Sequence, residues 1–135
     1  MIFFIKKKIF FSFLLICYTF IYPNLVDTSN NSQLKDNILI AIKKGSSKNL
    51  AKYFNENVEL LILDKEDIYS KAQAELILKD FFIKNKILKF KLIYKSKRKK
   101  ANYSIGELTT SRGSFRIFFL LKKGKIYQLR IERKI

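Results

Sequence analysis

Apolar residues recur at helical spacing in the segment that follows Asp27. The run SQLKDNILIAIKKG predicts a helix with Ser32 as its N-cap and Gly45 as its stop. Its buried face is expected to consist of Leu34, Ile38, Ala41 and Ile42. A second, short helix follows, capped by Ser46 or Ser47. Its inner side is expected to carry Leu50, Tyr53 and Phe54. The domain therefore begins with two helices.

A hairpin and a longer helix are predicted next. The run NVELLILDKEDIYS is apolar over the length of a strand, turns at the charged residues 64–67, and returns through Ile68 and Tyr69. Ser70 is expected to cap the helix that follows, because Gln73 three positions later completes a capping-box pattern. The buried face of this helix is expected to consist of Ala74, Ile77, Leu78 and Phe81.

After Asn85 the spacing of apolar residues changes to two, which predicts a strand with one buried face. The residues expected on that face are Leu88, Phe90, Leu92 and Tyr94. The runs ANYSIGELTT, SFRIFFLLKK and KIYQLRIERK predict three further strands, separated by the turn signals SRGS and KGK. Strands in this series form an antiparallel meander.

The charged run KSKRKK, Lys95 to Lys100, falls where the first meander strand must reverse into the second. We interpret it as an exposed turn, because a reversal at this place must be polar and exposed to solvent; lysines near sheet edges also discourage edge-to-edge pairing. Contact with an anionic surface such as phospholipid headgroups is one alternative. Nucleic acid is a weaker one, because no aromatic residue interrupts the run to stack on bases.

The N-terminal residues 1–23 have the order of a secretory signal, with Lys6, Lys7 and Lys8 before an apolar run of 14 residues. Such a run is shorter than a helical membrane span. The small residues of a cleavage site are missing, so an uncleaved membrane anchor is the alternative. Residues 24–31 are expected to be a linker and residues 32–135 the folded domain. The domain is expected to be exported, either periplasmic or anchored and facing the periplasm.

The composition limits the kinds of site that the domain can contain. The chain has 28 Lys and Arg against 11 Asp and Glu, giving a net charge of +17, but Cys17 is its single cysteine and it has no histidine. A disulfide framework and a zinc site are therefore not expected in the domain. The commonest general base is absent. We expect no metal and no cofactor, and no catalytic residue is assigned.

The order of elements resembles the nuclear transport factor 2-like, or cystatin-like, cone, an α+β fold with N-terminal helices and a long helix packed on a curved antiparallel sheet. The segments AIKKGSSKNLAKYFNENVEL, YSKAQAELILKDFF, SIGELTTSRGSFRIFFLLKK and IYQLRIER are similar to a bacterial family of small exported proteins of unknown function in that superfamily. The resemblance implies the fold and supplies no catalytic residues.

A cone of this type usually encloses a pocket between its sheet and its helices. The aromatic residues expected to line it are Tyr53, Phe54, Tyr69, Phe81, Tyr94, Tyr103, Phe119 and Tyr127. The alternative is that these rings fill the space as a solid core. Acid-base chemistry would need a buried carboxylate, for which the candidates are Glu59, Asp64 and Glu107.

Three further surface features have both a functional and a structural interpretation. The turn TTSRGS, Thr109 to Ser114, has hydroxyls around Arg112 that suit an anion or a plain hairpin turn. A basic stripe is expected from Arg116, Lys122 and Arg130, with a solvated sheet face as its alternative. Phe118 and Leu120 are candidates for an exposed apolar patch that would join two copies of the chain.

These features favour an envelope protein that binds an unknown small ligand or another envelope protein without catalysis. The alternatives are an isomerase or dehydratase that uses the cone pocket and a basic nucleic-acid-binding protein.

Overall fold

The computed structural model describes residues 28–96 and 102–135. The predicted signal segment, residues 1–23, and Lys97 to Lys100 of the charged run lie outside the described residues. None of the helices in the described part is long and apolar enough to cross a membrane.

Two helices open the described part, α2 (Thr28–Lys43) and α3 (Ser47–Ala51). Because α2 begins at Thr28, the prediction that Ser32 caps it is wrong. Gly45 ends α2 as predicted: it has a φ of 62°, and the backbone N–H of Ser46 donates to the carbonyl of Ala41, 2.9 Å away. This pattern is a Schellman motif, which favours glycine because of the positive φ. The backbone N–H of Asn49 donates to the Ser46 hydroxyl, so Ser46 caps α3.

A tight hairpin follows α3, formed by β1 (Phe54–Ile62) and β2 (Lys65–Ser70). Phe54 thus starts a strand and does not belong to the second helix. The turn consists of Leu63 and Asp64, so the prediction of a turn over residues 64–67 is wrong for the last three, which lie in β2. The reversal is two residues long because Leu63 adopts a φ of 58°.

The helix α4 (Lys71–Lys84) begins directly after β2. The predicted capping box is confirmed, because the backbone N–H of Gln73 donates to the Ser70 hydroxyl and the backbone N–H of Ser70 donates to the Gln73 side chain, each at 3.3 Å. The buried residues of α4 are Ala74, Leu78, Phe81 and Phe82. Ile77 was expected among them and is only partly buried.

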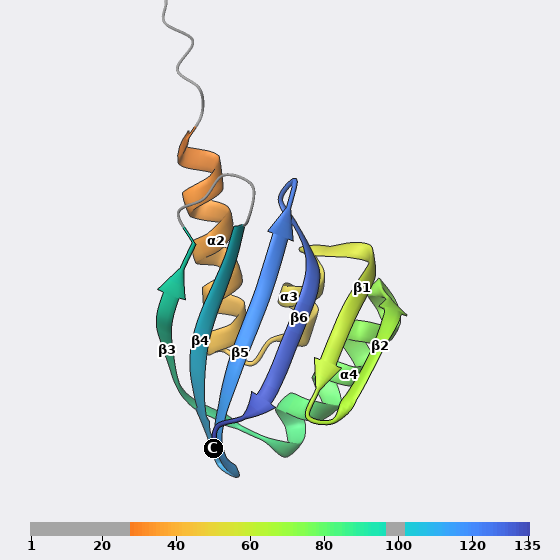
Figure 1. Cartoon of the computed structure of the whole chain (residues 1–135), viewed down its shortest axis with the longest axis vertical. Coiled ribbons are helices and arrows are strands. Elements are labelled where there is room, and N and C mark those ends of the chain that lie inside the picture. Colours follow the sequence, from red (N-terminus) through yellow and green to blue (C-terminus); the bar gives the residue numbers. More distant parts are fainter. Residues whose placement is uncertain (1–27, 97–101) are drawn as a thin grey trace, which may run out of the picture.

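The predicted meander is confirmed as β3 (Ile87–Lys95), β4 (Asn102–Thr110), β5 (Gly113–Lys122) and β6 (Lys125–Arg133). The strands form one sheet in the order β2-β1-β6-β5-β4-β3. All neighbours are antiparallel except β1 and β6, which are parallel and join the hairpin to the meander. The three helices of the described residues lie on one face of this sheet, α4 behind β1 and β2 and α2 toward β3 (Figure 1). The other face, which carries no helix from residues 28–96 and 102–135, is called the open face below.

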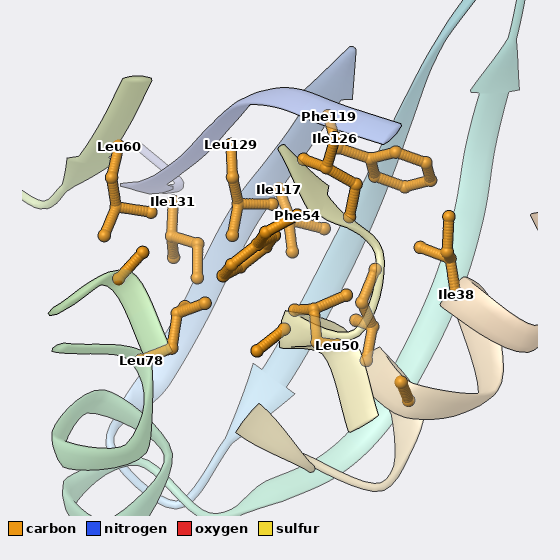
Figure 2. Close-up of a cluster of buried hydrophobic side chains, with 14 of the residues drawn as sticks. Ile38, Leu50, Phe54, Leu60, Leu78, Ile117, Phe119, Ile126, Leu129 and Ile131 are labelled. Carbon is orange, nitrogen blue, oxygen red and sulfur yellow. The ribbon is translucent and has the colours of Figure 1, made fainter. Parts of the chain in front are cut away.

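The core fills the space between the sheet and the helices (Figure 2). Its sheet side includes Leu60, Ile117, Phe119, Ile126, Leu129 and Ile131, all at most 1 % exposed. Phe54 lies between these residues and Leu50 and Leu78 of the helices. The rings of Phe81 and Phe115 meet edge to face with centroids 5.2 Å apart. The interior is thus packed with side chains.

The burial predicted for the first meander strand is wrong for most of its residues. Leu88, Leu92 and Tyr94 are exposed, and only Phe90 is partly buried against the core. The pairing of β3 with β4 is irregular twice, between Ile87 and Lys89 and between Leu92 and Tyr94. Each irregularity inserts one residue into β3, and each insertion exchanges the sheet faces of the residues that follow it. After the second insertion, Tyr94 therefore lies on the open face.

Candidate functional site

A hollow lies between the tip of the β1–β2 hairpin and the C-terminal half of α4. Its volume is about 590 Å³, which is within the usual range for small-molecule sites. It is lined by Leu60, Ile62, Leu63, Asp64, Lys65, Tyr69, Leu76, Ile77, Asp80, Phe81, Lys84 and Asn85. We call this hollow the hairpin cleft.

The hairpin cleft exists because of three local features of the chain. The two-residue turn brings Leu63 back toward α4. Tyr69 pairs with the buried Val58, which places its ring on the helix side of β2. The capping box at Ser70 starts α4 immediately after β2, so the helix packs back over its own hairpin. The cleft is thus built from consecutive segments of the chain.

The polar groups of the cleft lie mainly at its rim. The Lys84 ammonium pairs with the Asp80 carboxylate at 2.9 Å, and both side chains are more than half exposed. Asn85 is buried, but its Nδ2 donates to the carbonyl oxygen of Phe81 at 3.0 Å. Its hydrogen-bonding capacity is therefore partly used in ending the helix. The floor of the cleft offers apolar contact, and its rim offers charge of both signs.

The structure brings together two of the eight aromatic residues predicted to line a pocket. Tyr69 and Phe81 both line the hairpin cleft. Tyr53 lines a separate hollow of about 300 Å³ beside α2 and α3. Phe54 and Phe119 are buried in the core. Aromatic rings occupy much of the space where the cone pocket was expected.

Three other predicted aromatic residues lie away from the core. Tyr94 and Tyr103 stack on the open face with ring centroids 5.6 Å apart, and Tyr103 in turn contacts Phe118 with centroids 5.5 Å apart. Tyr127 is partly exposed and lies under the ammonium of Lys122, 5.2 Å from its ring centroid. These rings are occupied with one another or with a neighbouring cation.

The three candidate carboxylates are all outside the core. Glu59 accepts a hydrogen bond of 2.6 Å from Gln128 Nε2. Asp64 lies at the exposed hairpin turn and lines the cleft. Glu107 accepts a hydrogen bond of 2.8 Å from Lys134 Nζ, and this bond, together with the charges of Lys134, Lys91 and Arg116, lowers the Glu107 pKa from its usual value. None of these three groups is a carboxylate enclosed in the core.

Two hydroxyls of the Thr109 to Ser114 turn, those of Thr110 and Ser111, are engaged within the fold. Thr110 Oγ1 donates to the carbonyl of Gly113 at 2.8 Å and accepts from the backbone N–H of Arg112 at 3.1 Å. Ser111 Oγ accepts from the backbone N–H of Lys86 at 3.1 Å. This turn has the bonding of a structural hairpin turn that is also tied to β3.

The open face carries alternating charges across its strands. Arg130 approaches Glu66 at 3.9 Å and Glu132 at 3.8 Å, and Arg116 is directly opposite Glu107 and Glu132. The predicted basic stripe is therefore interleaved with carboxylates. Phe118 and Leu120 lie on this face as predicted but are partly buried. A shallow hollow of about 290 Å³ lies beside them.

Several cleft residues were not among the predicted site residues, including Leu63, Leu76 and Ile77. One feature of the sequence could have identified Leu76 as a cleft residue. The helix 71–84 has more apolar residues than a single buried face can hold, and Leu76 is the surplus residue on the cleft side. Such surplus apolar residues mark a helix with a second, incompletely covered surface.

The model of the domain of unknown function DUF4783 matches residues 35–132. A DUF4783 family protein of Bacteroides fragilis has a solved structure that is 34% identical, with a TM-score of 0.68, covering 73% of this chain and 96% of that chain. A similar protein of Bacteroides uniformis is 32% identical with a TM-score of 0.68, covering 74% and 96%. No curated protein matches the chain.

A more distant structure shows the fold alone. A domain of unknown function with a cystatin-like fold from Nostoc punctiforme is 13% identical with a TM-score of 0.60, covering 84% of this chain and 80% of that chain. Together with the helices packed on one face of a six-stranded sheet, this likeness confirms the predicted α+β fold class.

Proposed function

This chain belongs to the DUF4783 family, and from that premise we propose that it is a non-catalytic binding module of the cell envelope whose hairpin cleft holds a small apolar ligand. The observation that carries this proposal is the apolar lining of a hollow of about 590 Å³. Its polar groups are either at the rim or engaged with the backbone. The ligand that suits such a site is mainly apolar, with a polar end at the rim.

The exposure of Leu76 supports an occupant for the cleft. Leu76 lines the cleft and is 65% exposed, although it lies beside the partly buried Ile77 and Tyr69. A ligand in the cleft would remove this side chain from water, which is favourable in proportion to the apolar area covered.

The cleft is tested with the apolar fluorescent probe anilinonaphthalene sulfonate and two variants on one helix. Leu76→Asp places a charge in the cleft, whereas Ile83→Asp is the matched control, because Ile83 is 71% exposed on α4 and does not line the cleft. Loss of about 1 kcal/mol of apolar contact weakens binding by about fivefold. We expect this loss for Leu76→Asp alone. Equal losses in both variants, or no loss in either, would contradict the proposal.

The envelope location rests on the N-terminal segment, with its three lysines before an apolar run. It is tested by inserting an epitope into Lys95 to Lys100 and adding protease to spheroplasts. We expect cleavage in intact spheroplasts. Protection until the membrane is permeabilised would place the domain in the cytoplasm, and this result would leave the cleft experiment unaffected.

A further inference from the structure

Strand β3 exposes more large apolar side chains than any other element of the described part of the chain. Leu88 is 63% exposed, Ile93 51% and Tyr94 49%, and Leu92 is also exposed. Leu88 and Ile93 are the residues inserted at the two irregularities in the pairing with β4, and Tyr94 lies on the open face after the second one. This apolar surface lies at one edge of the sheet (Figure 1).

The same strand is strongly basic. Lys89, Lys91 and Lys95 are exposed between the apolar residues, and the sequence has no acidic residue between Asp80 and Glu107. Burial lowers the pKa of Lys35 on α2, and the charge of Lys95 lowers it further. The one carboxylate directly opposite this strand, Glu107 across from Lys91, is already bonded to Lys134. Positive charge is therefore in excess along this edge.

Another strand is a poor partner for this edge. Pairing with a further strand needs a regular row of backbone donors and acceptors, and β3 is irregular at two places within nine residues. Lysines on an edge strand also oppose such pairing. These features account for a protected edge, but they do not account for the exposed Leu88 and Ile93 between the lysines.

Nucleic acid is also disfavoured by the side chains. Leu88, Leu92 and Ile93 are aliphatic and have no ring on which a base could stack. The ring of Tyr94 is already packed against Tyr103. The surface combines aliphatic side chains, one tyrosine and lysine ammonium groups.

We propose that β3 docks the domain on an anionic phospholipid bilayer. Leu88, Ile93 and Tyr94 enter the headgroup region, and the neighbouring lysines contact lipid phosphates. Basic surfaces with exposed apolar and aromatic residues bind such bilayers through apolar burial and electrostatic attraction together. Strand β2 of the hairpin forms the opposite edge of the sheet from β3 (Figure 1). The hairpin cleft is lined by this hairpin and α4, so it stays open to solvent when β3 faces the lipid.

The orientation is tested first, using the absence of tryptophan from the chain. Tyr94→Trp and the control Ile68→Trp, on the opposite edge strand, each give the full-length protein a single reporter. We expect the fluorescence of the Tyr94→Trp variant to shift to shorter wavelength with vesicles of phosphatidylcholine and phosphatidylglycerol, and to change little with phosphatidylcholine alone. The control is expected to shift with neither. Because both variants keep residues 1–27, equal shifts at both positions, or none at either, would overturn the proposal.

Charge is tested with a matched pair of double variants. Lys89→Gln with Lys91→Gln removes two charges from β3, and Lys71→Gln with Lys79→Gln removes two exposed charges from α4. A lysine close to an anionic bilayer contributes about fivefold in affinity, so the first variant should bind these vesicles on the order of 25-fold more weakly. We expect about twofold or less for the α4 pair, because salt screens distant charges. Equal losses would show that net charge alone drives binding.

Binding of a single-stranded oligonucleotide with the same dependence on Lys89 and Lys91, in place of vesicle binding, would assign β3 to nucleic acid and overturn the proposal.

Discussion

Gly106 of β4 is in close contact with the bulged edge strand β3. A Cβ atom added there would lie 2.3 Å from Cε2 and 2.7 Å from Cζ of Phe90, and 3.2 Å from the backbone oxygen of Lys91. Since ordinary carbon contacts are about 3.5–4.0 Å, the Phe90 ring would have to move by about 1 Å or more. We expect Gly106→Ala to destabilise the protein by about 1–3 kcal/mol, the usual cost of overpacking.

The assay is urea unfolding of a double-mutant cycle with Phe90→Ala. The φ of Gly106 is not in the left-handed region, so alanine is acceptable to the backbone once the ring is removed. In the Phe90→Ala background, Gly106→Ala should therefore be neutral or stabilising by about 0.4–1 kcal/mol, because alanine restricts the unfolded chain. The sign of the effect is thus expected to depend on Phe90. An equal cost in both backgrounds would refute the idea that the ring requires a glycine.

The other predictions concern a cap, the core and an exposed carboxylate. Ser70→Ala should lower the free energy of unfolding by about 1 kcal/mol, because the capping box with Gln73 is lost; thermal unfolding with no loss would contradict this. Phe115→Ala should cost about 3–5 kcal/mol in urea, because the ring is fully buried and contacts Phe81; a cost under about 1 kcal/mol would mean that the site collapses around the smaller side chain. The hydrogen bond from Lys134 lowers the Glu107 pKa, so its contribution is present above the usual pKa of 4.5 and is lost as the pH falls through the lowered value. The urea midpoint of Glu107→Gln should therefore lie below that of wild type at neutral pH and meet it in strong acid, and a gap that persists in acid would argue against this linkage.

Elements defined by neighbours in the chain could be predicted from the sequence. The capping box at Ser70, the glycine stop at Gly45 and the order of the four meander strands depend on residues a few positions apart. Their physical causes are side-chain caps, positive φ and alternation, which leave direct traces in a sequence. Tyr69 and Phe81, which share the hairpin cleft, were predicted as lining residues of the cone pocket that the resemblance implies.

The face on which each β3 residue lies was decided only by the tertiary structure. An inserted residue changes no local pattern in KILKFKLIYK, but it exchanges the two faces for every residue that follows. The alternation thus predicted burial for Tyr94, which lies on the open face, whereas Leu92 keeps its predicted face opposite Gly106 and is exposed there. The parallel pairing of β1 with β6 likewise joins strands more than sixty residues apart, as in the pair Leu60 and Leu129. Local propensity determined which segments become helix and strand, whereas the long-range pairing of their backbones determined the open face and the basic edge, because those surfaces exist only once distant segments share one sheet.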